Sequence, residues 1–319
     1  MQTIGTPALW LVFTAVVIAA LYVDMLIMRN NGDHRVSTRE ALWWITLWVV
    51  LALLFNLGLW WHLRDTLLEV QANEYAIKFL TGYLLEKALA VDNLFVFLML
   101  FGYFAVPPER QQRVLIYGVI GAIALRAIMI FVGSALVARF HWILYFFGVF
   151  LLVTGVRMMW WGNKKPSLEG NRALLWLSGH LRLTSGFHGD RFVVLIDGVR
   201  HYTPLFLVMV MIAVTDVIFA VDSIPAIFAI TIDPFIVLTS NVFAVLGLRP
   251  LFFLLGSMAD RFHLLSYGLA FVLVFVGGKM LVAEYWTVPV GLALAIVGLA
   301  IGISMLLSVM RAPKDAAPR

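Results

Sequence analysis

Long apolar runs dominate this chain, and short polar stretches separate them. A helix that crosses a bilayer needs about 20 predominantly apolar residues, and nine runs reach roughly that length. They cover residues 7–28, 41–61, 76–104, 114–138, 142–161, 203–231, 235–258, 262–283 and 288–310. The first run has no basic stretch before it and no small-residue cleavage site after it, so we interpret it as a retained span. The pattern predicts an all-α polytopic membrane protein with nine transmembrane helices.

The composition agrees with this class. Hydrophobic residues make up 62% of the 319 residues and charged residues 13%, and the mean hydropathy is +0.96, whereas soluble domains are about 25% charged. The net charge of +5 comes from Lys and Arg scattered over short connections, which does not favour a nucleic-acid partner. The chain has no cysteine, which excludes disulfides, iron-sulfur clusters and thiolate metal sites.

Basic residues in the connections predict how the chain is oriented in the bilayer. If the N-terminus is outside, the cytoplasmic connections hold fifteen Lys and Arg residues, and the outer connections hold only Arg64 and Arg139. An excess of this kind is typical of cytoplasmic loops. We therefore expect the N-terminus outside and the C-terminus in the cytoplasm.

Two of the apolar runs contain carboxylates in matching patterns. Each has an acid, five further residues, and a second acid followed by an amide or a hydroxyl. The residues are Glu86, Asp92 and Asn93 in the first run and Asp216, Asp222 and Ser223 in the second. A charged side chain at the centre of a spanning helix costs roughly 2.5 to 3.5 kcal/mol, so such residues usually serve a function. The pattern indicates a duplicated acidic site.

The duplication extends into the two spans that follow each acidic run. Arg126 matches Arg249 at a shift of 123 residues, and Gly155 matches Gly277 at a shift of 122. Each copy then has three spans. Because three is odd and one cytoplasmic connection joins the copies, they must face opposite ways across the membrane. Inverted repeats with ionisable residues near the midplane are typical of secondary transporters.

The repeats divide the chain into five parts. These are two N-terminal transmembrane helices (1–75), a first three-helix repeat (76–161), a cytoplasmic connection (162–202), a second, inverted three-helix repeat (203–283) and a C-terminal transmembrane helix with a short basic tail (284–319). Within the connection, residues 171–183 predict an amphipathic helix on the inner leaflet. Residues 192–203 predict a hairpin with a type I′ turn at Asp197 and Gly198.

The spacing of the acids raises a geometric question. Residues six apart on a regular helix point about 240° apart, so Glu86 and Asp92 share no face, whereas Glu86 and Asn93, seven apart, do. A break in each acidic helix would bring all the groups together. Pro225 provides a cause in the second copy, because proline donates no backbone hydrogen bond. Phe95 stands at the matching position of the first copy, where the residues give no cause.

The candidate metal ligands are Glu86, Asp92, Asn93, Asp216, Asp222 and Ser223. Carboxylate, amide and hydroxyl oxygens suit hard or borderline cations such as Mg²⁺, Ca²⁺ and Mn²⁺. The seven histidines lie in connections or at span ends, so zinc, copper and nickel are poor candidates. Lys87 has no counterpart in the second copy, and we interpret it as a local charge partner. We expect no prosthetic group.

A structural role for the same acids stays open. Glu86 and Asp216 could form buried ion pairs with Arg126 and Arg249, whose positions recur in step with the acids. Pairing and transport are compatible, because a basic partner can occupy the site when the cation leaves. Asp24, outside the repeat, either snorkels to the inner surface or lines an exit. We therefore class Arg126, Arg249 and Asp24 as charge partners or gating residues.

Four stretches closely resemble the TerC/Alx family of bacterial integral membrane proteins: EKALAVDN (86–93), DVIFAVDSIPAIF (216–228), DPFIVLTSN (233–241) and LGLR (246–249). The likeness covers nearly the whole chain. It implies a place in the LysE-type transporter superfamily, the bacterial inner membrane, manganese export from the cytoplasm with metal supply to secreted proteins, and a link with tellurium resistance. It also implies that the family's acidic positions carry over to the four carboxylates above. One departure is Ala213, where relatives resembling Alx usually carry a glutamate.

These observations support two hypotheses. The first is a secondary transporter that exports Mn²⁺ in exchange for protons, because carboxylates bind a metal when deprotonated and release it on protonation. The second is a non-transporting membrane partner of secretion or stress-resistance machinery, whose buried charges fix the packing. An enzyme is not expected, since the chain has no HExxH motif, no Gly-rich nucleotide loop and no histidine within a span to activate Ser223.

Overall fold

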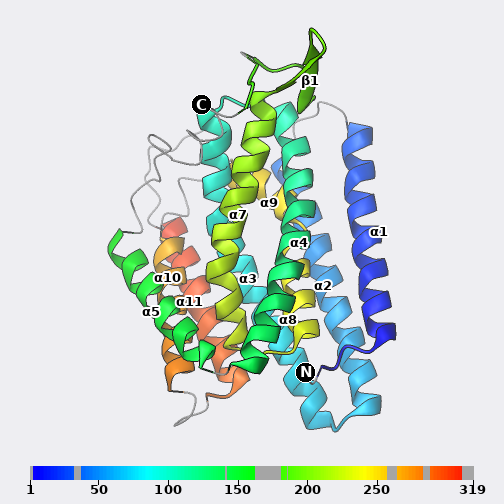
Figure 1. The fold of residues 1–319 in the computed structure, drawn as a ribbon. Coiled ribbons are helices and arrows are strands. Elements are labelled where there is room, and N and C mark those ends of the chain that lie inside the picture. Colours follow the sequence, from blue (N-terminus) through cyan, green and yellow to red (C-terminus); the bar gives the residue numbers. More distant parts are fainter. Residues whose placement is uncertain are drawn as a thin grey trace.

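The computed structural model describes residues 3–31, 37–140, 142–161, 181–184, 186–256, 264–282 and 288–310. Its helices are α1 (Pro7–Asn31), α2 (Thr38–Thr66), α3 (Glu69–Tyr103), α4 (Pro108–Arg139), α5 (Ile143–Trp161), α7 (Pro204–Phe228), α8 (Pro234–Val245), α9 (Leu248–Gly256), α10 (Leu265–Leu281) and α11 (Val290–Met310), shown in Figure 1. Helices α1, α4, α7 and α8 begin at a proline, whose fixed φ and missing N–H suit the first helical turn.

The helices form a polytopic membrane bundle. By length and composition, α1, α2, α4, α5, α7 and α11 can each cross a bilayer, and α8 with α9 makes a seventh span with a 42° bend. The other two predicted spans coincide with α3, which is 35 residues long but charged, and α10, which has 17 residues. Nine transmembrane helices therefore stay a prediction. Large apolar side chains cover the outside of the bundle, for example Leu11 and Leu299, as expected where lipid replaces water.

Helix α3 lies at the centre of the bundle and contacts α2, α7, α8, α9, α10 and α11. Helix α8 is buried along its whole length. It packs against α3, while α7 packs against α4 and α5 packs against α10. The two acidic helices, α3 and α7, are thus held between elements from the opposite half of the chain.

Small residues allow α5 and α10 to cross closely. A Cβ atom on Gly155 would lie 2.8 Å from the backbone oxygen of Ala270, and one on Gly277 would lie 2.7 Å from that of Gly148. Glycine at helix crossings permits such an approach in membranes, where close packing and not the hydrophobic effect holds helices together. The glycines that match in sequence therefore meet at one interface.

A break separates α8 from α9. Gly247 has φ +82°, a conformation that non-glycine residues rarely adopt, and a Cβ atom there would lie 2.7 Å from the ring of Trp48 in α2. The bend thus has two local causes, the left-handed backbone and the close approach of an indole. No such break interrupts the acidic helices α3 and α7.

The hairpin predicted in the long connection is present. Strands β1 (Val193–Ile196) and β2 (Val199–Tyr202) pair antiparallel, with Ile196 opposite Val199. Asp197 and Gly198 form the turn with φ of 52° and 75°, the positive values that a type I′ turn needs. The hairpin projects from the end of the bundle opposite the start of α1 (Figure 1). The predicted helix at 171–183 lies mostly outside the described residues.

Candidate functional site

Arg126, near the middle of α4, is the centre of the buried polar network. Its guanidinium forms an ion pair with Glu86 of α3 and donates 3.1 Å hydrogen bonds to Asp216 Oδ1 of α7 and Asn241 Oδ1 of α8. Glu86 and Arg126 are each 1% exposed and Asp216 is 6% exposed. One arginine therefore ties four helices together, and it joins the first acids of the two matching runs.

The charges in this network do not balance. Glu86 and Asp216 carry two negative charges when ionised, and Arg126 supplies one positive charge. Asp216 Oδ2 has no hydrogen-bond partner among the described residues, and neither has Asn241 Nδ2. A buried polar atom left unpaired costs about 1 to 3 kcal/mol. The network thus has the unused acceptor and the excess negative charge that a proton or a cation would satisfy.

The second members of the acidic pattern are also inside the bundle. Asn93 is 9% exposed and Ser223 is 1% exposed, and Ser223 Oγ has no partner within the described part of the chain. Asp92 and Asp222 lie within α3 and α7, but their side chains are outside the described residues. Among the side chains that are described, no three of Asp, Glu and His gather closely enough to hold a metal.

Both acidic helices are continuous, so neither has the break that would bring its two acids toward one point. Helix α3 runs from Glu69 to Tyr103 and α7 from Pro204 to Phe228, with Pro225 inside it. Helix α7 continues through Pro225 to Phe228, although proline donates no hydrogen bond to the carbonyl of Val221. Backbone carbonyls that accept from a side chain lie instead at the α8–α9 break, in the span that follows the second acidic helix.

Arg249 does not pair with Asp216. Its Nη2 atom lies 2.7 Å from Asp24 Oδ1 of α1, and their side chains are 7% and 17% exposed. The proposed Glu86–Arg126 pair is present, and Asp216 shares the same arginine. Asp24 is therefore the partner of Arg249, and this ion pair fastens α1 to α9.

Lys87 contacts backbone and not a carboxylate in the described part of the chain. Its Nζ atom donates to the carbonyl oxygens of Ala244 at 3.1 Å and Leu246 at 3.3 Å, at the end of α8. A cation at a helix C-terminus is stabilised by the negative end of the helix dipole. Neither this contact nor that of Asn241 with Arg126 was predicted from the sequence. Two features of the sequence could have pointed to these contacts. They are the polar triplet directly before Val242 and Gly247, which interrupts the apolar run.

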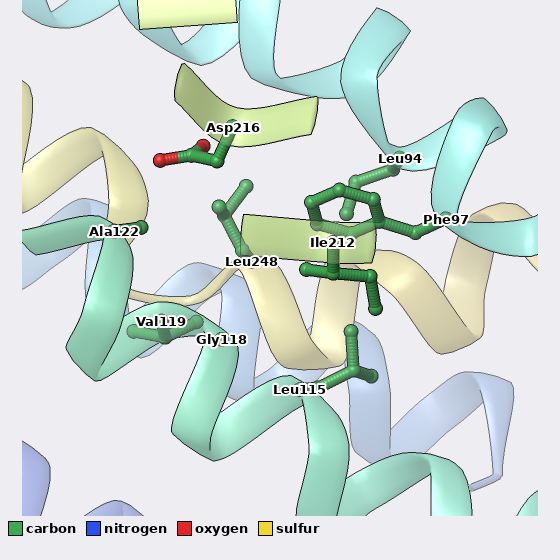
Figure 2. A pocket seen from close by; sticks show the side chains of 9 residues that line it. All are labelled: Leu94, Phe97, Leu115, Gly118, Val119, Ala122, Ile212, Asp216 and Leu248. Carbon is green, nitrogen blue, oxygen red and sulfur yellow. The ribbon is translucent and has the colours of Figure 1, made fainter. Parts of the chain in front are cut away.

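A small cavity lies beside Asp216. It has a volume of about 20 Å³, and a single water needs about 10 to 15 Å³. Figure 2 shows Asp216 as the acidic member of an otherwise apolar lining, with Leu94 and Phe97 from α3, residues of α4 and Leu248. The structure therefore leaves room for about one water next to the carboxylate and none for a hydrated ion.

Ala213, where a glutamate is expected, is exposed on the outside of α7, whereas Asp216, three residues later, is buried. The missing carboxylate would accordingly not join Arg126 in this conformation. The departure from the usual pattern removes no member of the buried network.

Comparisons with known proteins identify the chain's relatives. The profile described as "Integral membrane protein TerC family" matches residues 71–316. A Salmonella typhi protein named "Putative membrane-bound redox modulator Alx" is 52% identical over 93% of this chain and 92% of its own length. A Myxococcus xanthus protein, "Uncharacterized membrane protein STKORF319", is 42% identical over 97% and 94%. No solved structure matches. The chain belongs to the TerC family of integral membrane proteins.

Proposed function

We propose that this protein is a secondary transporter that exports Mn²⁺ from the cytoplasm in exchange for protons. The observation that carries the proposal is the buried network of Glu86, Arg126 and Asp216, which has one more carboxylate than guanidinium. An ionisable group within a membrane span marks a substrate or proton pathway by default. This network has three such groups at the meeting point of the acidic helices.

The proposed ligands are the oxygens of Glu86, Asp92, Asn93, Asp216, Asp222 and Ser223. Hard and borderline divalent cations prefer carboxylate, amide and hydroxyl oxygens. Arg126 pairs with both carboxylates that a metal would otherwise use and balances one of their two charges, so we assign this conformation to the cation-free state. Metal binding requires the guanidinium to withdraw, and its return helps to expel the cation.

Apolar clusters on both sides of the network support an occluded state. On the side of the hairpin, Leu94, Leu115 and Ile212 belong to one cluster, and on the side of the N-terminus, Phe79 and Phe243 belong to another. The chain thus has two apolar barriers with polar groups between them. Transport by alternating access opens one barrier at a time.

Reciprocal contacts support inverted repeats. If α3, α4 and α5 correspond to α7, α8–α9 and α10, the α3–α8 contact has its counterpart in α7–α4, and α5–α10 is its own counterpart. The glycine contacts also match when the two copies are interchanged. Gly155 meets Ala270, and Gly277 meets Gly148, each partner lying 122 residues from its match. A two-fold axis in the membrane plane, as in many secondary transporters, relates such pairs.

The alternative is a non-transporting membrane partner, and the observation that favours it is that Arg126 already pairs with both Glu86 and Asp216. A buried ion pair can exist solely to fix packing. The name "redox modulator" of the relatives points to a further role. Because the chain has no cysteine, such a role would not use its own thiols, whereas moving a redox-active metal is compatible with it.

The test is Mn²⁺ flux into proteoliposomes under an imposed pH gradient. We expect the gradient to drive flux and both Asp216→Asn and Asp222→Asn to lower it at least about tenfold, since even outer-shell substitutions at metal sites cost 10- to 100-fold. The control is Asp190→Asn, in the exposed segment before the hairpin, where it pairs with Arg113. Equal flux in all four proteins, or none in correctly inserted protein, would favour the non-transporting partner.

A further inference from the structure

The α8–α9 break gathers backbone oxygens inside the bundle. The last carbonyls of a helix have no partner within it, and Gly247, with φ +82°, turns the chain directly after Leu246. The turn aims the carbonyl oxygens of Ala244 and Leu246 at one point, where the Lys87 ammonium lies 3.1 and 3.3 Å from them. Both carbonyl residues are buried, at 0% and 3% exposure.

The occupant of this point comes from the neighbouring helix. Lys87 reaches it from α3, and no carboxylate lies within salt-bridge distance of its Nζ atom among the described residues. A part-buried ammonium that is away from carboxylates and held by carbonyl oxygens behaves as a tethered monovalent cation. Backbone carbonyls and half-helix ends coordinate free monovalent cations in the same way in channels and transporters.

We infer that the carbonyl oxygens of Ala244 and Leu246, at the break between α8 and α9, form a cation site separate from the carboxylate site, which the Lys87 ammonium fills and which accepts small monovalent cations when that ammonium is absent. The ligand class follows from charge. The oxygens are neutral, and a helix C-terminus contributes roughly half a negative charge. This partial negative charge suits a cation with a charge of +1, whereas a divalent ion would need carboxylate ligands. The inference does not depend on manganese transport.

The cation at this site also stabilises the bent segment between α8 and α9. Trp48 covers Gly247 on one side, and the Lys87 ammonium holds the carbonyls on the other. Asn241, one turn earlier in α8, receives Arg126. Two tethered cations thus brace the last turns of α8, one through a side chain and one through the backbone. Removing the ammonium leaves the bent segment without its electrostatic support.

The experiment is chemical rescue of Lys87→Ala, followed by thermal unfolding of the purified protein in detergent without Mn²⁺. The substitution removes three methylenes and the ammonium, which n-propylammonium replaces. We expect the variant to melt about 5 °C lower than the unchanged protein, within the range for losing one strong interaction in a domain of this size. n-Propylammonium should restore at least half of the loss.

Controls separate charge from packing. The neutral analogue 1-propanol should restore little, and Lys78→Ala, which removes a lysine paired with Glu74 in the same helix, should show no ammonium-dependent rise. Equal rescue by propanol, or a Lys87→Ala protein as stable as the unchanged one, would overturn the inference.

A second variant covers the case in which Lys87→Ala does not insert. Lys87→Met keeps most of the volume and removes the charge. We expect NH₄⁺ and K⁺ to raise its melting temperature more than tetramethylammonium, which is too large for the site. Identical responses to the three cations contradict a cation site. Because none of these measurements uses flux, failure of the transport proposal leaves their outcome unaffected.

Discussion

The two arginines that match in the internal duplication have different partners. Arg126 lies inside α4 and pairs with acids from α3 and α7, one from each copy. Arg249 lies two residues after the break and pairs with Asp24 of α1, which is outside the duplicated part. The duplicated sequence therefore forms one shared ionic network instead of two equivalent ones. The second arginine serves to attach the first helix.

The surrounding helices differ in the same way. The first copy reads IALR over residues 123–126, within the continuous helix α4, and the second reads LGLR over 246–249, at the break. Ala124 keeps α4 straight, whereas Gly247 allows the left-handed turn. At this position the two copies therefore differ by one methyl group. Alanine stands in the continuous helix, and glycine stands at the bend.

The largest effect is expected from Arg126→Met. It leaves Glu86 and Asp216 as buried carboxylates without their counter-ion, and breaking a buried pair typically costs about 3 to 5 kcal/mol. Thermal unfolding in detergent measures the loss. Arg139→Met, at the exposed end of the same helix, is the control and should change little. A stable Arg126→Met protein would show that protons already neutralise the acids, and that Arg126 is not their counter-ion.

Gly247→Ala tests the break itself. The positive φ and the contact with Trp48 both resist a Cβ atom, so we expect a loss of about 1 to 3 kcal/mol. Gly121→Ala is matched to it, because Gly121 lies in α4 with open space around its Cβ position, and alanine favours a helix by about 1 kcal/mol over glycine. If both substitutions have the same effect, the left-handed turn at Gly247 is not required.

The Arg249–Asp24 pair is expected to contribute less than the Arg126 network, because its carboxylate is more exposed. A double-mutant cycle with Arg249→Met and Asp24→Asn should give a coupling free energy of about 1 kcal/mol. Unfolding of the four proteins supplies the numbers. Strictly additive single effects would mean that the ion pair does not hold α1.

The smallest effect is expected from Ala213→Glu. The side chain at 213 is exposed on α7, whereas Asp216 is buried, so we expect an added carboxylate to stay outside the network. Mn²⁺ flux in proteoliposomes should stay within about twofold of the unchanged protein, since surface substitutions away from a site have small effects. A several-fold rise would indicate that α7 rotates during transport and brings this position to the cation.

Patterns within one helix were predictable from the sequence. Apolar runs located the helices, and the Asp197–Gly198 turn predicted the hairpin, because both follow from local backbone preferences. The duplication also suggested the pairing of Glu86 with Arg126. Pro225 misled the prediction because the loss of one backbone hydrogen bond, to the carbonyl of Val221, does not by itself interrupt a helix, and α7 continues to Phe228.

Contacts between distant helices were not predictable. The sequence places Asp24 outside the repeat, so nothing pointed to Arg249 as its partner. Lys87 was read as a local charge partner because Glu86 is adjacent in sequence, yet adjacent residues on a helix point about 100° apart. Its direction toward the end of α8 follows only from how α3 packs in the bundle.

The most direct test of the exchange mechanism is the lumenal pH of proteoliposomes after Mn²⁺ is added outside. Our account predicts that Mn²⁺ entry drives protons out and makes the lumen alkaline, and that Asp216→Asn suppresses this response. Mn²⁺ entry with no change of lumenal pH, or a response that survives Asp216→Asn unchanged, would contradict exchange through the Arg126 network.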